Sequence, residues 1–518
     1  MKKMQIITRS CLLLATAIFL SQSLFAQNKI ILDPSKAKDT INRNIYGHFA
    51  EHLGRCIYDG IYTGNKNIPN KNGIRLDIVE ALKKLKIPVL RWPGGCFADT
   101  YHWKDAIGPK EKRKQISNTS WGNVREDNSF GTHEFLDFCE MIGAEPYLAV
   151  NMGSGTVQEA VDWVHYVNHA NGASYLTDMR AQNGRANPWK VKYWGIGNES
   201  WDCGGHMTAD YYVNEYRKYA TMMTSYGNTE RLFRIAVGPG TEDYAWTETV
   251  MKEIPARRIE GVSIHHYSVI NWSKKGSATQ FSEEEYFRTM EQAWRMERMV
   301  KKNKEVMDKY DPQKRVALIV DEWGGWYDVE PGTNGAFLYQ QNTMRDAMIA
   351  GLSLNIFNNH CDRVRMANLA QMVNVLQAVI LTKEEKLVLT PTYHVMEMYN
   401  VHQDAQMIPL VMTSNDYTMG DKKIQAISAS ASRDKNGVTH ISLVNIDANT
   451  EQEVQVNLGS INAKSVTGRI LQSAKLQDHN TFDNPEKIKP AAFTGATLSG
   501  NNLSVKMPPF SVVVLALK

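Results

Sequence analysis

The chain has 518 residues, of which 22% are charged and 43% hydrophobic, the composition of a globular protein with room for one large domain and a smaller one. Such a composition argues against disorder and against a fibrous repeat. The formal net charge is +4, and it falls to +1 without the three basic residues among the first 26. A near-neutral balance with no long basic run argues against nucleic acid as the main partner.

Residues 1–26 have the organisation of an export signal. Basic residues precede the apolar run 11–20, and residues 23–26 offer a cleavage site. The apolar run is too short to span a bilayer, and no other stretch is apolar enough to do so. We therefore predict a soluble, exported protein, periplasmic or secreted, without a membrane segment after cleavage.

Five cysteines remain after that cleavage. They are Cys56, Cys96, Cys139, Cys203 and Cys361. An odd, scattered set without Cys-x-x-Cys spacing indicates neither a disulfide framework nor a zinc site. At most two disulfides could form, and we expect mostly buried free thiols.

Short apolar runs alternate with helical patterns from residue 44 to about 390. The predicted strands are 44–49, 87–92, 145–150, 191–196, 233–237, 262–266, 316–320 and 352–357. The predicted helices are 76–85, 132–142, 157–168, 209–225, 247–253, 284–310 and 336–350. Eight strands that alternate with helices predict an α/β fold, a closed (β/α)₈ TIM barrel.

A doubly wound open sheet is the alternative to the barrel. Its nucleotide-binding loop requires Gly-x-Gly-x-x-Gly after the first strand. Gly195-Ile196-Gly197 is the nearest approach, but it lies in the middle of the chain, and Ser200 stands at the position of the third glycine. The pattern therefore favours the barrel.

The last part of the chain has a different pattern. Residues 424–432 and 438–445 flank a polar turn, as in a β-hairpin, and 454–458 and 503–507 alternate strictly between apolar and polar residues. This pattern predicts a C-terminal all-β sandwich. We expect four parts, which are the signal at 1–26, a strand segment packing on the sandwich at 27–43, the catalytic barrel at 44–390 and the sandwich at 391–518.

Two glutamates stand at the ends of predicted strands. Glu199 ends the fourth strand and Glu322 the seventh, and in a (β/α)₈ barrel both ends lie on the rim that carries the active site. Either residue alone could be a buried structural acid. Two carboxylates facing one cleft are what glycoside cleavage requires, since one protonates the departing oxygen and the other attacks the anomeric carbon or activates water.

Several stretches along the barrel carry a family resemblance. They are Gly47–Gly54, Arg91–Gly95, Phe130–Thr132, Ala149–Gly155, Gly197–Glu199, Val320–Trp323 and Ala370–Asn374. In this order they resemble glycoside hydrolase family 51, the α-L-arabinofuranosidases, whose members also carry a C-terminal β-sandwich. The resemblance implies a retaining, exo-acting, homo-oligomeric enzyme that needs no cofactor or metal. Its substrates would be terminal arabinofuranosyl units of plant polysaccharides or oligosaccharides of the arabinan or arabinoxylan type.

The resemblance also implies catalytic roles. Glu199 is expected to be the general acid/base and Glu322 the nucleophile of a double displacement. Arg91 and Tyr267 are expected to orient the nucleophile and keep it ionised. The Tyr267 side chain is also expected to contact the substrate.

Five further positions are expected to bind the sugar. Asn198 matches the amide that binds the 2-hydroxyl, Glu51 and Gln371 match hydroxyl-binding groups, and Trp326 matches an aromatic wall. Cys96 stands where some family members have an asparagine, and a thiol is a weaker hydrogen-bond partner. The subsite could therefore be drier here.

Other chemistries are less consistent with the sequence. His265 and His266 are adjacent, so their side chains should point to opposite sides of a strand, which argues against a zinc site. A β-xylosidase or an endoglucanase on the same scaffold is the rival enzyme, and a non-catalytic carbohydrate-binding protein is the rival of another class. The presence of both Glu199 and Glu322 argues against the latter.

Overall fold

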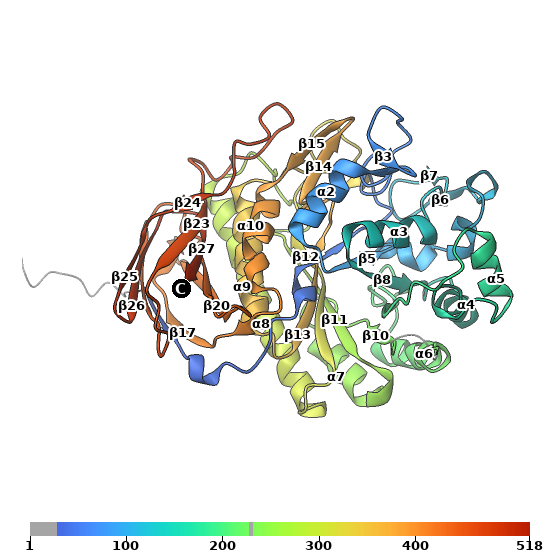
Figure 1. The fold of residues 1–518 in the computed structure, drawn as a ribbon, viewed down its shortest axis with the longest axis horizontal. Coiled ribbons are helices and arrows are strands. Elements are labelled where there is room, and N and C mark those ends of the chain that lie inside the picture. Colours follow the sequence, from blue (N-terminus) through green and yellow to red (C-terminus); the bar gives the residue numbers. More distant parts are fainter. Residues whose placement is uncertain (1–27, 227–230) are drawn as a thin grey trace, which may run out of the picture.

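The computed structural model describes residues 28–226 and 231–518 of the chain (Figure 1). The export signal predicted at residues 1–26 lies outside the described residues. Within the described part, no helix is both long enough and apolar enough to cross a membrane.

Eight parallel strands close into a barrel, which confirms the predicted fold class. In chain order they are β2 (Gly47–Phe49), β5 (Val89–Trp92), β8 (Glu145–Val150), β9 (Tyr193–Ile196), β10 (Phe233–Ala236), β11 (Gly261–Ser268), β12 (Ala317–Gly325) and β13 (Val364–Ala370). Neighbours in sequence are neighbours in the barrel, and β13 pairs with β2 to close it. β9 is thus the fourth strand and β12 the seventh.

Helices surround this barrel (Figure 1). They are α2 (Leu76–Leu85), α3 (Thr132–Ile142), α4 (Val157–Asn168), α5 (Tyr175–Gln182), α6 (Ala209–Met222), α7 (Tyr244–Glu253), α8 (Glu283–Tyr310), α9 (Met344–Asn359) and α10 (Pro391–Tyr399). Most begin at a serine or threonine whose hydroxyl accepts a backbone N–H of the first turn, as at Thr156, Thr208 and Ser282. Short hairpins in the loops are β3 (Asn70–Lys71) with β4 (Ile74–Arg75), β6 (Ile116–Asn118) with β7 (Val124–Glu126), and β14 (Ile380–Lys383) with β15 (Lys386–Leu389).

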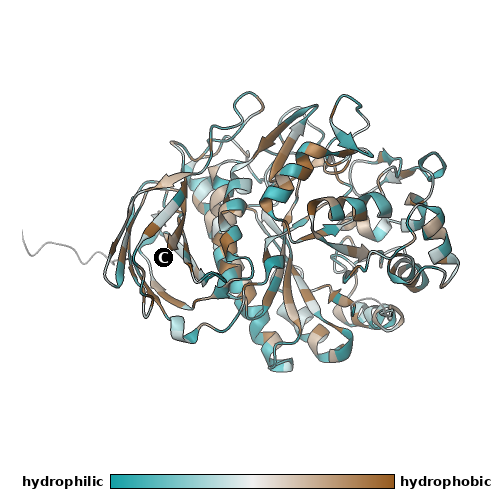
Figure 2. Cartoon of the chain, viewed as in Figure 1, coloured by the Kyte–Doolittle hydropathy of each residue, from teal (hydrophilic) through white to brown (hydrophobic). Residues whose placement is uncertain are grey.

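The eighth predicted strand, residues 352–357, is wrong. These residues form the second half of α9, and the eighth strand is β13. Nearly every residue of α9 is buried because the helix lies between the barrel and the C-terminal sheets (Figures 1 and 2). A helix buried on all sides has no exposed polar face, and residues 352–356 alternate between apolar and polar side chains, which is the pattern of a strand.

The C-terminal part forms two facing antiparallel-rich sheets. The first contains β17 (Leu410–Thr413), β1 (Asn28–Leu32), β22 (Gln452–Asn457), β26 (Asn502–Met507) and β25 (Ala496–Ser499). The second contains β16 (Gln406–Met407), β20 (Ile427–Arg433), β21 (Thr439–Asn445), β27 (Ser511–Leu517), β23 (Val466–Leu471) and β24 (Ala491–Phe493). A separate hairpin joins β18 (Asp416–Met419) to β19 (Lys422–Gln425). The inward residues of both sheets share one apolar core, to which β1 contributes Ile30 and Leu32.

Polar contacts fix the second sheet to the barrel through α9. Asn355 and Asn358 donate their side-chain amides to the hydroxyls of Ser428 and Ser430 on β20, at 3.2 and 3.1 Å. All four side chains are buried. Buried amide–hydroxyl pairs have few alternative partners, so they specify one orientation of α9 against the sheet.

A buried ion pair joins the end of α8 to the start of β13. Arg363 is fully buried, donates to Asp311 Oδ2 at 3.0 Å, and also donates to the carbonyl oxygens of Asp311 and Val316. Arg315 reaches the other oxygen of the same carboxylate at 3.2 Å, but its side chain is 62% exposed.

We expect Arg363→Met to lower the free energy of unfolding by about 3 kcal/mol, because it leaves Asp311 buried without its main cation. Arg315→Ala is the matched control and should cost less than about 1 kcal/mol, because the cation it removes is largely exposed and Arg363 still pairs with Asp311. Urea unfolding followed by circular dichroism measures both. Equal losses in the two variants would contradict this account.

Candidate active site

A tight turn after β9 presents Glu199. Gly197 and Glu199 both have positive φ angles, of 88° and 31°. The backbone N–H groups of Asp202 and Gly204 donate to the carbonyl of Glu199 at 2.7 and 3.1 Å. A Cβ on Gly204 would lie 1.8 Å from the carbonyl oxygen of Asn198, so only glycine fits there. This turn fixes the position from which the Glu199 carboxylate enters the barrel mouth.

A bulge in β12 presents Glu322. Ile264 pairs with Val320, but the next residue, His265, pairs with Glu322, so Asp321 is the extra residue. Side chains normally alternate between the two faces of a strand, and a bulge interrupts that alternation. The consecutive carboxylates of Asp321 and Glu322 can therefore both contact the same buried cation.

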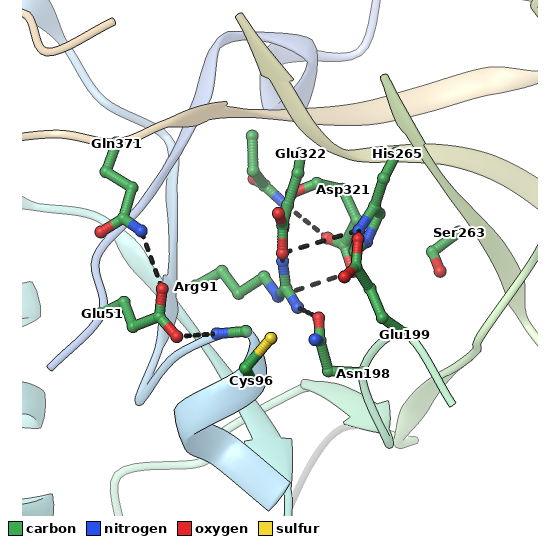
Figure 3. A network of polar contacts seen from close by, with 12 residues as sticks. Glu51, Arg91, Cys96, Asn198, Glu199, Ser263, His265, Asp321, Glu322 and Gln371 are labelled. Carbon is green, nitrogen blue, oxygen red and sulfur yellow. Dashed lines mark hydrogen bonds and ion pairs between the residues drawn. The ribbon is translucent and has the colours of Figure 1, made fainter. Parts of the chain in front are cut away.

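That cation is Arg91 on β5 (Figure 3). Its Nη1 lies 2.8 Å from Glu322 Oε1, its Nη2 donates to Asn198 Oδ1, and its Nε lies 3.6 Å from Asp321 Oδ2. Burial opposes the charge of Arg91, but Asp321 and Glu322 outweigh this effect and raise the pKa of the guanidinium. Arg91 therefore stays charged between the strands that carry the site.

The surroundings of Glu322 keep it ionised. Tyr267 on β11 donates its hydroxyl to Glu322 Oε2 at 2.7 Å. Burial favours the neutral carboxyl, but the charges of His265 and Arg91, with the hydrogen bonds from Tyr267 and Arg91, hold the pKa of Glu322 below its usual value. Arg91 and Tyr267, both predicted from the resemblance to be site residues, thus both contact Glu322.

His265 lies between the two glutamates, and the sequence interpretation missed it. Its Nδ1 is 2.8 Å from Glu199 Oε1 and 3.6 Å from Glu322 Oε1. Burial favours neutral imidazole, but Glu322 and Glu199 raise the pKa of His265. The sequence did indicate His265, because residues i and i+2 of a strand share a face and Tyr267 was already expected in the site. His266 points away and hydrogen-bonds the carbonyl of Gln292, as the strand alternation predicts.

Asn198 is held at both its backbone and its side chain. Its Oδ1 accepts from Arg91, which leaves the two N–H bonds of Nδ2 directed away from Arg91. Its backbone N–H donates to Asp99, which also accepts from the N–H groups of Met152 and Gly153 at 2.8 Å. Burial raises the pKa of Asp99 to about 7, although these three N–H groups act in the opposite direction. Asp99 therefore connects the loops that follow β5, β8 and β9.

Glu51 sits across the site from Glu199, in a polar cradle (Figure 3). Its Oε1 accepts from the backbone N–H groups of Gly95 and Phe97 and from Trp121 Nε1, and its Oε2 accepts from Gln371 Nε2 at 2.9 Å. Burial and the charge of Glu322 raise the pKa of Glu51 to about 7 against these hydrogen bonds. Gln371 Oε1 is buried and has no partner among the described residues, so it can accept a hydrogen bond from a ligand.

Aromatic rings line one side of the rim. Tyr267 and Trp326 meet edge to face with ring centroids 5.1 Å apart, and Trp326 meets Trp272 in the same way at 5.4 Å. Trp326 is half-buried and lies beside Tyr267, which contacts Glu322, whereas Trp272 is 56% exposed. The wall expected from Trp326 therefore extends outward through Trp272.

Cys96 is not a free thiol. It forms a disulfide with Cys203, with Cα atoms 5.5 Å apart, so the expectation of a thiol in the sugar subsite is wrong. The partner was not predictable from spacing, because the two cysteines are 107 residues apart and meet only when the loops after β5 and β9 converge. Cys56, Cys139 and Cys361 are buried free thiols, as expected.

Single ligand atoms of Glu199, His265 and Glu322 all lie within 4.8 Å of one another, close enough to share a cation. The guanidinium of Arg91 already lies 2.8 Å from Glu322, and its positive charge disfavours a metal ion on that carboxylate. The group is better suited to moving protons than to holding a metal.

Comparisons with known proteins agree with this geometry. The family described as "Alpha-L-arabinofuranosidase 1 domain" matches residues 81–291, and "Alpha-L-arabinofuranosidase C-terminal domain" matches residues 321–511. A Bacteroides ovatus protein named intracellular exo-α-L-arabinofuranosidase is 50% identical over 98% of this chain and 99% of its own.

Solved structures are similar over nearly the whole chain. The family 51 arabinofuranosidase from Xanthomonas axonopodis pv. citri has a TM-score of 0.93 and 43% identity, covering 95% of this chain and all of that one. The α-L-arabinofuranosidase from Thermotoga maritima, solved as an arabinose complex, has a TM-score of 0.83 and 32% identity, covering 95% and 99%.

The predicted exported location is wrong on these comparisons. The Bacteroides ovatus relative, which matches the chain almost from end to end, is named an intracellular enzyme. The basic and apolar residues at the N-terminus were therefore misleading as evidence for export.

The closed eight-stranded barrel, with glutamates at the ends of its fourth and seventh strands, agrees with these matches. The chain belongs to glycoside hydrolase family 51, the α-L-arabinofuranosidases.

Proposed function

We propose that the chain removes terminal, non-reducing α-L-arabinofuranosyl units from plant glycans with retention of configuration. The observation that carries the proposal is the closeness of the two carboxylates, since one oxygen of Glu199 and one of Glu322 lie within 4.8 Å of each other. Retaining glycosidases place the two carboxyl groups about 5–5.5 Å apart, whereas inverting ones need about 6.5–9.5 Å to admit a water molecule.

In the first step, Glu322 attacks the anomeric carbon while Glu199 protonates the departing oxygen. Arg91 and Tyr267 favour ionised Glu322, which is the form that attacks. His265, with the proton on Nδ1, donates to Glu199 Oε1, so Oε2 is the oxygen left to carry the acid proton toward the leaving group. The arabinosyl group is then covalently attached to Glu322.

In the second step, Glu199 takes a proton from water, which attacks the anomeric carbon and releases arabinose. The negative charge on Glu322 disappears when the ester forms, and the change favours Glu199 as a base. Two inversions at one carbon restore the original configuration.

Polar groups around the pair suit a furanose ring. Asn198 Nδ2 can donate to the 2-hydroxyl, Glu51 can accept from sugar hydroxyls, and Gln371 Oε1 offers a free acceptor. The name of the Bacteroides ovatus relative supports exo action. The family resemblance supports a homo-oligomer, which light scattering would test.

The two glutamates should respond differently to azide. We expect Glu322→Ala to lose at least about 10⁴-fold in kcat on an aryl α-L-arabinofuranoside, because no nucleophile remains, and azide should restore turnover with an inverted azide product. Glu199→Ala should retain the first step on substrates with good leaving groups, and azide should yield a retained product. Kinetics and product NMR measure these outcomes.

Two controls accompany this test. The melting temperatures of both variants should match that of the unmodified protein, so that lost activity reflects chemistry. Release of arabinose, rather than xylose or glucose, from matched aryl glycosides separates the arabinofuranosidase from the rival xylosidase or endoglucanase. Near-native rates in both variants would overturn the assignment.

Tyr267→Phe tests the tuning of Glu322. The loss of its hydrogen bond removes a group that lowers the pKa of Glu322, so the pKa rises. Since the ionised carboxylate attacks, the acidic limb of the pH profile of kcat/KM should move to higher pH. At the optimum, kcat/KM should fall about tenfold to hundredfold, as expected for a hydrogen bond to a charged group.

Tyr211→Phe is the matched control, because Tyr211 is an exposed tyrosine on α6. It should leave both the rate and the pH profile unchanged. An unshifted acidic limb in Tyr267→Phe would mean that Tyr267 does not tune the nucleophile.

A further inference from the structure

The disulfide lies against the proposed acid/base. Cys203 Sγ is 3.8 Å from Glu199 Oε2 and 3.9 Å from Asn198 Nδ2. A carboxylate oxygen of Glu199 and the two sulfurs all lie within 4.8 Å of one another. Figure 3 shows Cys96 next to Asn198. Neither sulfur has a role in the proposed reaction.

Both cysteine segments are held in place without the disulfide. On one side, the N–H groups of Gly95 and Phe97, which flank Cys96, donate to buried Glu51. On the other, the N–H groups of Asp202 and Gly204, which flank Cys203, donate to the carbonyl of Glu199. Reduction would therefore leave the two thiols close together.

A third contact ties the two segments to each other. Asp99 belongs to the same short helix as Cys96 (Cys96–Thr100), and it accepts from the backbone N–H of Asn198, next to Glu199. Gly204 approaches so closely that a Cβ there would lie 2.8 Å from Asp99 Oδ2. Asp99 thus connects the segment that carries Cys96 to the segment that carries Glu199 and Cys203.

The two oxygens of Glu199 face different partners. Oε1 accepts from His265 at 2.8 Å, while Oε2 faces the sulfurs and the open mouth of the site. The Glu199 carboxylate is partly exposed, and Cys203 is exposed, so solvent reaches this side. One oxygen of a fixed carboxylate therefore points at two sulfurs that are also fixed.

We propose that reduction of the Cys96–Cys203 disulfide creates a binding site for a soft divalent metal ion, formed by the two thiolates and Glu199. Thiolates are the ligands that such ions prefer, and two thiolates, a carboxylate and a water complete a tetrahedral zinc site. With Zn–S bonds of about 2.3 Å, two sulfurs on one ion lie about 3.8 Å apart. Cα atoms 5.5 Å apart allow this separation by rotation of the side chains.

A dithiol supplies the two electrons for the opening. One of its thiolates attacks the exposed Cys203 Sγ, the S–S bond breaks, and Cys96 leaves as a thiolate that takes a proton. The second thiol of the reductant then attacks its own sulfur in the mixed disulfide, closes a ring and releases Cys203. The products are two protein thiols and the cyclic disulfide, and the metal ion later displaces the two thiol protons.

Metal binding would inhibit the enzyme. The ion would occupy Glu199 Oε2, the oxygen that carries the acid proton in the proposed mechanism, and would compete with the substrate. Inhibition rests on the proposed role of Glu199, whereas metal binding itself does not.

The test uses the full chain with Cd²⁺ as the probe. Oxidised protein and protein reduced with a dithiol, then desalted without oxygen, are titrated with Cd²⁺ while activity and the ultraviolet charge-transfer band of cadmium thiolates are recorded. We expect the reduced protein to remain active and to bind one Cd²⁺, as measured by the charge-transfer band. The Cd²⁺ concentration that halves its activity should be at least tenfold lower than for the oxidised protein. A chelator should restore its activity.

Three variants assign the ligands. Cys203→Ser should lose the band after reduction, whereas Cys361→Ser, which removes a buried thiol elsewhere, should keep it. Glu199→Gln should weaken Cd²⁺ binding by about tenfold or more in the absorbance titration, which needs no activity.

Several outcomes overturn the proposal. They are equal Cd²⁺ sensitivity of the oxidised and reduced proteins, a band that survives in Cys203→Ser, or loss of activity on reduction alone, which would make the disulfide a structural tether. A band without inhibition would leave the metal site standing and would count against Glu199 as the acid/base.

Discussion

The buried guanidinium of Arg91 is the interaction on which the site depends. It contacts Glu322 and Asn198 from β5, so one group positions the proposed nucleophile on the seventh strand and the amide after the fourth. Asp321 supplies a second carboxylate, itself held by Tyr147 at 2.7 Å and Asn368 at 2.7 Å. A buried charge is costly unless paired and hydrogen-bonded, so this network tolerates few other arrangements. The bulge in β12 is what brings both acids to Arg91.

Much of the barrel was predictable because its strands and helices have distinct periods, and the strand count alone placed Glu199 and Glu322 on one rim. The error at residues 352–357 arose because α9 is covered on both sides, by the barrel and by the second sheet of the sandwich. Periodicity reports on the contrast between a buried and an exposed face, and a fully buried helix has none. Periodicity alone therefore does not predict such a helix, because its burial depends on the elements that pack on both of its sides.

Some residues of the site were predicted from the sequence, and others were missed. The family resemblance predicted Arg91, Tyr267, Glu51 and Gln371 as site residues. In the structure, Arg91 and Tyr267 contact Glu322, and Gln371 donates to Glu51. His265 was missed even though strand alternation with Tyr267 indicated it. The disulfide was missed for a different reason, because its cysteines lie in loops after different strands and their meeting depends on loop conformation. Contacts between loops are the part of a barrel that no local pattern encodes.

Burial favours a raised pKa for Glu51, Asp99 and Glu322 alike, but the groups beside each acid decide whether its pKa ends above or below the usual value. It raises the pKa of Glu51 and of Asp99 to about 7, because both bind mainly neutral N–H groups. Glu322 is equally buried, yet its pKa is lowered, because a guanidinium and an imidazole stand beside it. Neutral donors stabilise a carboxylate less than a cation at the same distance does. Glu51 and Asp99 can therefore gain or lose a proton near neutral pH, while Glu322 remains charged.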